Sequence, residues 1–386
     1  MRIAHVITRL ILGGAQENTL LCCEDLRRDY GDEVLLIAGP PLGPEGSLLE
    51  RARRSGIPLK IIPPLRRAIE PWHDLRSYGA IRQALREFQA DVVHTHSAKA
   101  GMLGRAAAWS LRVPAIVHTV HGAPFHPYQS RLARELIRAC ERWAARRCHA
   151  MVSVADAMTE LMVAAGVAPR AMFTTVYSGM EVEPLLHADL LRAETRRTLG
   201  YRDEHVVVGK IARLFHLKGH SFVIEAAGQV VAQNPQVRFL LVGDGLLRRQ
   251  LQRQIAAAGL DPYFQFTGLV PPERIPALVA ACDVVVHASL REGLARVLPQ
   301  ALIAGRPAVS FDVDGAREVV IPGSTGYLVP PGQIAALSQA ILELACDPAL
   351  RGRLGAEGRR RWADVFRHSR MTAQLRAIYA RLLGPD

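Results

Sequence analysis

Short apolar runs alternate with longer amphipathic stretches throughout the first half of the chain. The stretches at 75–88 and 131–147 have apolar residues at helical spacing. Apolar runs of strand length occur at residues 3–7, 34–38, 59–62, 91–95, 115–119 and 151–154. This alternation predicts an α/β domain in which helices cover both faces of a parallel sheet.

The pattern loosens near residue 180 and then begins again. A loop-like segment at 178–189 and a charged helix at 190–199 precede the second series of apolar runs. These runs fall at 206–211, 237–242, 264–267, 284–287 and 308–311. We therefore predict two doubly wound domains, covering residues 1–185 and 186–368, and a last amphipathic helix at 369–383. Ligands of such open sheets bind at the carboxyl ends of the strands.

Length and charge add to this picture. A chain of 386 residues is too long for one ordinary core and suits two domains. The formal net charge of +12 favours an anionic partner. Three classes of partner fit: nucleic acid, an acidic membrane surface and a phosphate-bearing substrate. Basic clusters interleaved with aromatic residues are absent from the sequence, so we expect no nucleic-acid partner.

The cysteines and the hydropathy pattern indicate an intracellular protein. None of the six cysteines forms a CxxC pair or has zinc-site spacing, so we expect reduced thiols and no metal. No apolar run approaches the ~20 residues of a membrane-spanning helix. The N-terminal run resembles a weak signal peptide, but Gly13-Gly14 and the helical pattern after it fit a strand and its loop better. We expect a cytoplasmic protein that associates peripherally with the inner face of the membrane.

Two strand-to-helix loops carry residues suited to phosphate. Gly13 and Gly14 let the backbone approach a ligand before a helix N-terminus, although a tight turn without a ligand explains them as well. This loop is not the GxGxxG of a dinucleotide site, which disfavours a dehydrogenase. Arg213 and Lys218 flank a strand end and a helix start, where they can aim two cations at one diphosphate. The alternative for this pair is two solvated charges.

The stretch from Arg291 to Pro307 is the most informative part of the sequence. It follows an apolar strand, begins with Glu292 and Gly293 in a loop, and continues into a helix that contains Gln300. Two polar groups eight residues apart can contact two parts of one long ligand.

The ordered motifs make the chain similar to the family 4 retaining glycosyltransferases, and this resemblance covers essentially the whole chain. The motifs are the glycine loop near residue 14, the segments 91–101 (DVVHTHSAKAG) and 118–122 (HTVHG), the Arg213/Lys218 pair, the segments 242–245 (VGDG) and 266–268 (FTG), and the Glu292 motif. The resemblance implies the GT-B fold, with two Rossmann-like domains facing a cleft and a C-terminal helix, 369–386, that returns to the N-terminal domain.

The resemblance also implies the roles of individual residues. Catalysis would involve His121, Arg213, Lys218 and Glu292, although His121 could also be an ordinary loop histidine. The residues implied in donor binding are Gly14, Arg213, Lys218, Gly243, Gly268, Glu292, Gly293, Leu294, Ala295 and Gln300. Arg66, Arg67 and Lys99 are the candidate acceptor contacts.

One position departs from the family pattern. The family usually has glutamate where this chain has Gln300, and that carboxylate accepts hydrogen bonds from both ribose hydroxyls. A hydrogen bond to a charged group contributes about 1.5–3 kcal/mol, against roughly 0.5–1.5 kcal/mol for a neutral one. We therefore expect weaker donor binding without loss of transfer.

The expected activity is metal-independent, cofactor-independent transfer from a nucleotide sugar, most simply a UDP-sugar, to a glycan or polyprenyl-linked acceptor in cell-envelope polysaccharide synthesis. The basic, partly apolar segment 131–147 suits an anionic membrane surface or a solvated helix face. Two alternatives stay open at this point. One is a nucleotide-sugar-binding protein with impaired transfer, which Gln300 suggests, and the other is a nucleotide-sugar epimerase with the same fold.

Overall fold

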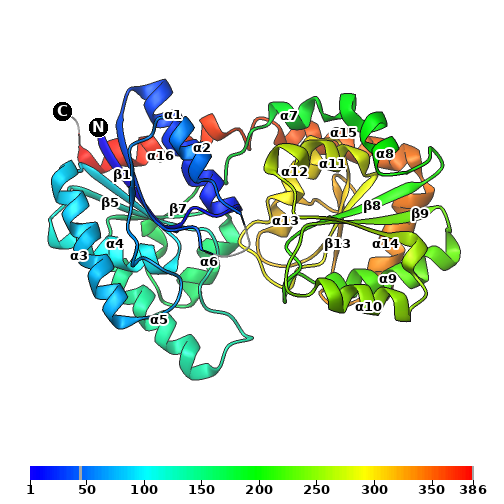
Figure 1. Ribbon diagram of the computed structural model, residues 1–386, viewed down its shortest axis with the longest axis horizontal. Helices are drawn as coiled ribbons and strands as arrows, with labels where there is room; N and C mark the ends of the chain where they lie inside the picture. Colours follow the sequence, from blue (N-terminus) through cyan, green and yellow to red (C-terminus); the bar gives the residue numbers. More distant parts are fainter. Residues whose placement is uncertain (43–45, 385–386) are drawn as a thin grey trace. The chain divides into compact units, whose positions relative to one another are not determined.

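The computed structural model describes residues 1–42 and 46–384, which form two compact units (Figure 1). Unit 1 comprises Met1–Met180 together with Arg367–Asp386, and unit 2 comprises Glu181–Phe366. The sequence placed these boundaries at 185/186 and 368/369. Both units are parallel α/β sheets with helices on their faces, so the predicted fold class is confirmed.

Unit 1 is built on a parallel sheet with the order β3-β2-β1-β4-β5-β6-β7 among the described residues. Its strands are β1 (Arg2–Arg9), β2 (Glu33–Gly39), β3 (Leu59–Ile61), β4 (Val92–His96), β5 (Ala115–Val120), β6 (Ala150–Ser153) and β7 (Phe173–Thr175). Its helices are α1 (Gly14–Tyr30), α2 (Leu49–Arg54), α3 (Pro71–Phe88), α4 (Ala98–Ser110), α5 (Arg131–Ala145), α6 (Asp156–Ala164) and α16 (His368–Leu383). The strand interiors are buried almost throughout, because parallel sheets are covered on both faces.

Unit 2 repeats this plan with the order β10-β9-β8-β11-β12-β13. Its strands are β8 (Val206–Ile211), β9 (Val237–Val242), β10 (Phe264–Gly268), β11 (Val284–His287), β12 (Ala308–Phe311) and β13 (Gly326–Val329). Its helices are α7 (Glu183–Leu186), α8 (Arg192–Thr198), α9 (His220–Gln233), α10 (Arg248–Ala257), α11 (Ile275–Ala281), α12 (Val297–Ile303), α13 (Ala316–Val319), α14 (Ile334–Cys346) and α15 (Pro348–Trp362). The charged helix expected at 190–199 is shorter, since a 3-10 turn at Ala188–Leu191 precedes α8.

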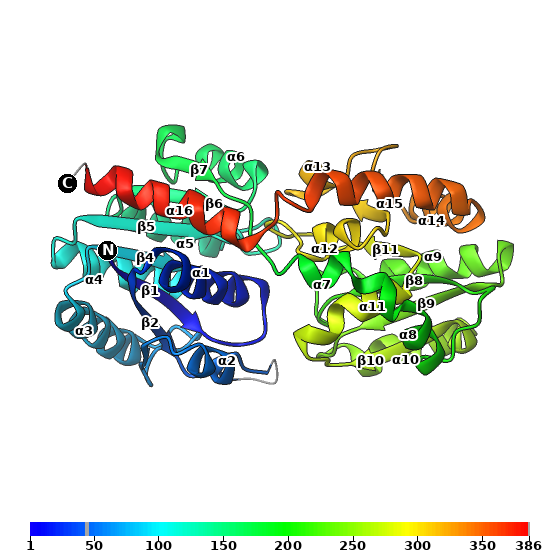
Figure 2. The same ribbon diagram turned by 90° about the horizontal axis from the view of Figure 1, so that it is seen from above.

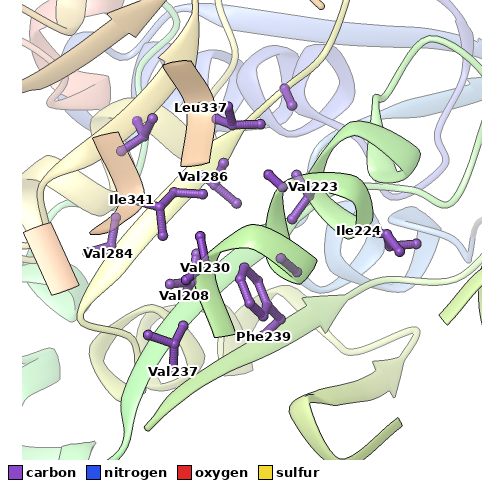
Figure 3. Close-up of a cluster of buried hydrophobic side chains, with 14 of the residues drawn as sticks. Val208, Val223, Ile224, Val230, Val237, Phe239, Val284, Val286, Leu337 and Ile341 are labelled. Carbon is purple, nitrogen blue, oxygen red and sulfur yellow. The ribbon is translucent and has the colours of Figure 1, made fainter. Parts of the chain in front are cut away.

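The core of unit 2 lies between its sheet and the neighbouring helices α9 and α14 (Figure 3). Val223 and Val230 of α9 belong to the same buried cluster as Phe239 of β9, which is fully buried. Removing such a buried aromatic side chain costs about 3–5 kcal/mol. The sheet is therefore a rigid base for the loops at its carboxyl edge.

Helix α16 follows unit 2 in the sequence but belongs to unit 1. It packs against α1 and β5, as Figure 2 shows for the red helix. The hydroxyl of Tyr379, fully buried on α16, is hydrogen-bonded to His94 Nδ1. Asp25 Oδ2 accepts hydrogen bonds from His368 Nδ1 at 2.7 Å and from the Thr372 hydroxyl at 2.8 Å. The C-terminal helix thus belongs to the N-terminal unit by polar as well as apolar contacts.

Each sheet has one point at which the strand order reverses direction. In unit 1 this point lies between the adjacent strands β1 and β4, and in unit 2 it lies between β8 and β11. The loops that leave the carboxyl ends of such strands diverge to opposite faces and open a crevice, where ligands of doubly wound sheets bind. No described helix is long and apolar enough to cross a bilayer.

Candidate active site

The switch point of unit 2 brings together Lys218 and Glu292. Lys218 lies in the loop between β8 and α9, and Glu292 lies in the loop between β11 and α12. The ammonium of Lys218 donates to Oε1 of Glu292, and both side chains are 23% exposed. The backbone N–H of Glu292 donates to Asp314 Oδ2 at 2.6 Å, and this hydrogen bond holds the loop between β11 and α12 in place. Two residues 74 positions apart in sequence therefore form one charged pair.

Glycine is required beside this pair. Gly219 caps the N-terminus of α9 with φ of 67°, a left-handed conformation that side chains rarely adopt. A Cβ atom at this position would lie 1.8 Å from the carbonyl oxygen of Ala288. The close approach of the two loops thus depends on the missing side chain, and it sets the position of Lys218.

The electrostatics of the pair keep Glu292 ionised. Burial raises the pKa of this carboxyl group, but His287, with Nε2 3.7 Å from Oε1, and the adjacent Lys218 outweigh burial. The pKa of Glu292 is therefore held well below its usual range. A permanently charged carboxylate is a strong acceptor for hydroxyl groups.

Lys210 is a second lysine at the switch point of unit 2, and no role was predicted for it from the sequence. Its side chain is 1% exposed, and its ammonium has no hydrogen-bond partner within the described part of the chain. Burial, followed by the charge of Lys218, lowers the pKa of Lys210 to about 7. The signal that could have identified it is a lysine within the otherwise apolar strand 206–211.

Arg213 and the two predicted glycines occupy neighbouring loops of unit 2. Arg213 is exposed after β8, with its guanidinium 5.0 Å from the centre of the Phe215 ring. The backbone N–H of Gly243 donates to the carbonyl of Gly268 at 3.1 Å. A Cβ atom on Gly243 would lie 2.3 Å from the Ala212 carbonyl oxygen, so β8, β9 and β10 approach closely at their carboxyl ends.

The rest of the predicted donor segment follows Glu292. Gly293, Leu294 and Ala295 are buried, and the carbonyl of Gly293 accepts from the N–H of Gly315 at 3.1 Å. Gln300 lies within α12 and is half-buried. The segment is thus tightly packed, as a backbone surface that contacts a ligand must be. Roles for these residues stay predictions.

In unit 1, the predicted residues lie in separate loops at the carboxyl edge of the sheet. Gly14 is the first residue of α1, directly after the loop that follows β1. His121 follows β5, and its Nε2 is 3.1 Å from Nδ1 of His96. His96 ends β4 and also contacts His5 of β1. No role was predicted from the sequence for His5, His94 or His96, although His94 and His96 are two residues apart on one strand and so share a face.

The candidate acceptor residues lie on one side of unit 1. Arg66 and Arg67 are exposed in the loop before α3. Lys99, at the start of α4, donates to Asp74 and to the carbonyl of Ala68, so it holds this loop in place. Contact of these three residues with an acceptor stays a prediction.

Both halves of the chain match models of glycosyltransferase domains. Residues 13–177 match the glycosyl transferase 4-like domain, and residues 192–361 match the glycosyl transferases group 1 domain. The chain is 29% identical to 2-deoxystreptamine glucosyltransferase of Streptomyces kanamyceticus over 78% of this chain and 80% of the relative. It is 26% identical to UDP-Gal:alpha-D-GlcNAc-diphosphoundecaprenol alpha-1,3-galactosyltransferase of Escherichia coli over 91% and 89% of the two chains.

Solved structures have the same fold. Anabaena HepE in complex with UDP and glucose superposes with a TM-score of 0.82 at 23% identity, covering 98% of this chain and 99% of that one. WaaG, a glycosyltransferase involved in lipopolysaccharide biosynthesis, gives a TM-score of 0.76 at 15% identity, with coverage of 98% and 99%. The predicted enzyme class is confirmed, and the chain belongs to glycosyltransferase family 4, whose members have the GT-B fold.

Proposed function

We propose that this glycosyltransferase moves a hexose from a UDP-sugar to a lipid-linked glycan in cell-envelope polysaccharide synthesis, with retention of the anomeric configuration. The observation that carries the donor half of the proposal is the Lys218–Glu292 pair at the switch point of unit 2. The names of two similar proteins support the substrates. HepE was crystallised with UDP-glucose, and the Escherichia coli relative uses UDP-galactose and a diphosphoundecaprenol acceptor.

The two members of the pair suit opposite ends of a nucleotide sugar. The ionised carboxylate of Glu292 would accept hydrogen bonds from sugar hydroxyls, while Lys218 and Arg213 would bind the diphosphate. The N-terminus of α9, one residue beyond Gly219, adds the positive end of a helix dipole. Because the loops already hold both residues at the site, the main change on donor binding is that the Lys218–Glu292 contact is exchanged for contacts with the donor.

Transfer would then proceed on the front side of the sugar. The bond from the anomeric carbon to the diphosphate oxygen breaks as the bond from the acceptor oxygen forms, and the acceptor proton passes to the departing phosphate. Lys218 and Arg213 stabilise the negative charge that develops on the diphosphate. The family resemblance also implies that His121 contacts the transferred sugar. By this route the protein supplies positioning and charge, and we expect neither cofactor nor metal.

One face of unit 1 suits a membrane carrying the acceptor. Trp72 of α3 is 78% exposed and Leu132 of α5 is 82% exposed, although both are large apolar side chains. A groove of about 810 Å³ between α3, α4 and α5 is lined by apolar residues that include Leu75, Trp109 and Trp143. Arginines recur along α5 at positions 131, 134, 138 and 142, and Arg146 directly follows the helix. Exposed apolar side chains flanked by cations favour an anionic bilayer surface.

Donor use is tested by incubating the purified protein with UDP-glucose, UDP-galactose or UDP-N-acetylglucosamine and measuring UDP release, with and without EDTA. Release with one donor, insensitive to EDTA, supports the proposal. Tight UDP-sugar binding without release from any donor, even with polyprenyl-linked glycan acceptors, would instead establish a binding protein. NMR of the product anomeric proton decides retention.

Membrane binding is tested by co-sedimentation with vesicles of phosphatidylcholine alone or with phosphatidylglycerol. We expect binding that needs phosphatidylglycerol and is lost in a Trp72→Ser, Leu132→Ser double variant. Leu246→Ser, at an exposed leucine of unit 2, is the matched control. Equal binding of the double variant would contradict this assignment of the face.

A further inference from the structure

Three histidines of unit 1 form a hydrogen-bonded chain that ends at His121. His5 Nδ1 lies 3.0 Å from His96 Nε2, and His96 Nδ1 lies 3.1 Å from His121 Nε2. The rings of His5 and His96 are stacked, with an interplanar angle of 10°. His5 is on β1 and His96 on β4, so the chain crosses the switch point of the sheet.

Burial keeps the first two rings neutral. His5 and His96 are 0% and 1% exposed. Burial lowers the pKa of His5 to about 3, and it lowers that of His96 well below the ordinary value. A neutral imidazole carries one N–H, so His96 donates through one nitrogen and accepts through the other. When His121 is neutral too, the two hydrogen bonds require all three rings to carry their proton on Nδ1, or all three on Nε2.

The same cluster also has the spacing of a metal site, because ligand nitrogens of His5, His94 and His96 lie within 4.8 Å of one another. The hydrogen bonds argue against this use. His94 is bonded to Tyr379 through Nδ1 and to Thr119 through Nε2, and both nitrogens of His96 are engaged as well. A metal ion would have to displace several of these bonds, whereas an orienting network uses all of them.

The row of hydrogen-bonded histidines ends at His5. His5 Nε2 is buried and has no hydrogen-bond partner within residues 1–42 and 46–384. A proton that enters at His121 therefore finds no acceptor beyond His5, so the chain cannot conduct protons. What it can do is to hold the His121 ring in one orientation and one tautomer.

We propose that His96 and His5 are positioning residues that fix the orientation and tautomer of His121. The inference rests on the proposed function in one respect, namely that His121 contacts the transferred sugar. A ring fixed before the donor binds presents a defined donor or acceptor atom to a sugar hydroxyl, as preorganised polar sites require.

The first test needs no activity. In protein labelled with ¹⁵N at histidine, long-range ¹H–¹⁵N spectra report which nitrogen of each ring is protonated, and single substitutions assign the rings. We expect His5, His96 and His121 to share one tautomer. Different tautomers within the chain would overturn the proposal, and so would one equivalent of zinc that binds and shifts the histidine signals.

The second test uses a conservative rescue. In His5→Asn the amide group takes the place of Nδ1, whereas His5→Leu removes the contact. We expect His5→Leu to lower kcat for UDP release roughly 10- to 100-fold, with KM for the donor changed less than threefold, and His5→Asn to restore most of kcat. His94→Phe, outside the chain, is the control for packing damage. Equal activity of His5→Leu and the wild type would refute the positioning role.

The two tests separate the possible failures. If the three histidines share one tautomer but His5→Leu has a normal kcat, the hydrogen bonds are confirmed and the positioning role of His5 and His96 is refuted. A wild-type protein that releases no UDP would contradict the proposed function, and the tautomers would still decide the structural inference by themselves.

Discussion

Lys218 and Glu292 are joined by a charge-assisted hydrogen bond across the carboxyl ends of adjacent strands β8 and β11. The bond places the cation expected at the leaving diphosphate and the anion expected at the sugar in direct contact. A bound donor would therefore exchange this contact for contacts with each group. The pair is the part of the site from which the sharpest functional predictions follow.

Lys218→Ala should lower turnover roughly 10²- to 10³-fold, because one group that stabilises developing charge is lost. The measurement is the steady-state rate of UDP release. Lys60→Ala, at an exposed lysine of β3 in unit 1, is the matched control and should keep the wild-type rate. A loss smaller than threefold at Lys218 would refute its role.

Gln300→Glu should tighten donor binding several-fold. A carboxylate at this position of α12 would accept charge-assisted hydrogen bonds from the ribose, worth on the order of 1–1.5 kcal/mol more than those of the amide. Calorimetric titration with UDP measures the change. Unchanged or weaker affinity would mean that the ribose is held elsewhere.

Gly219→Ala should destabilise unit 2 by more than about 1 kcal/mol and weaken donor binding, because Cβ would collide with the Ala288 carbonyl at a left-handed position. Gly228→Ala is the matched control in the same helix. Apart from the chain neighbours and the backbone of α9 itself, no described heavy atom lies within 4 Å of a Cβ there, so we expect a gain of about 1 kcal/mol. The midpoints of urea unfolding are measured for both variants. Equal midpoints for Gly219→Ala and Gly228→Ala would contradict the prediction.

Lys210 should make the stability of unit 2 depend on pH. The unfolded chain keeps the proton of this lysine up to its ordinary pKa of 10.5, whereas the folded chain releases it near 7. Between these values the unfolded state binds more protons, so the free energy of unfolding rises with pH by about 1.4 kcal/mol per unit.

Lys210→Met should therefore flatten the rise above pH 7 and stabilise unit 2 most below pH 7. Hydrogen exchange of peptides from β8 and β11, followed by mass spectrometry at pH 7 and 9, measures the stability of unit 2 separately from that of unit 1. In Lys60→Met the dependence should persist. A wild-type protein without this slope would show that Lys210 keeps its proton in the folded state.

Tyr379→Phe should lower the stability of unit 1 by about 1–3 kcal/mol, because it leaves the buried Nδ1 of His94 without its hydroxyl partner. Tyr128→Phe removes a hydroxyl from a side chain that is 57% exposed and should have little effect. Thermal midpoints of the two variants are compared with the wild type. Similar midpoints for both would show that His94 finds another partner.

The sequence predicted the strands that are long and buried, because such strands read as continuous apolar runs. It omitted β7 and β13, which are three and four residues long at the ends of their sheets. The sequences of β7 (Phe-Thr-Thr) and β13 (Gly-Tyr-Leu-Val) contain polar residues or glycine and do not read as continuous apolar runs, whereas the equally short edge strand β3 was predicted from the run 59–62. Loop positions such as Arg213, Lys218 and Glu292 could be predicted, because they follow recognisable strands.

Side-chain partnerships between distant segments could not be predicted in the same way. Asp314 supports Glu292 only because β12 lies beside β11, and His5 meets His96 only because β4 lies beside β1. Such contacts depend on strand order and register, which the pattern of apolar residues leaves undetermined. Polar residues inside apolar strands, such as Lys210 and His94, are the sequence features that could have drawn attention to these contacts.

The return of α16 to unit 1 has a consequence for synthesis of the protein. Unit 2 is one continuous segment, so it can fold as soon as Phe366 has left the ribosome. Synthesis of unit 1 starts before that of unit 2, yet Tyr379 and the rest of α16 are translated after unit 2, so the core of unit 1 closes only once α16 has left the ribosome. A chain broken off between Phe366 and α16 would therefore contain a complete unit 2 and an unfinished unit 1.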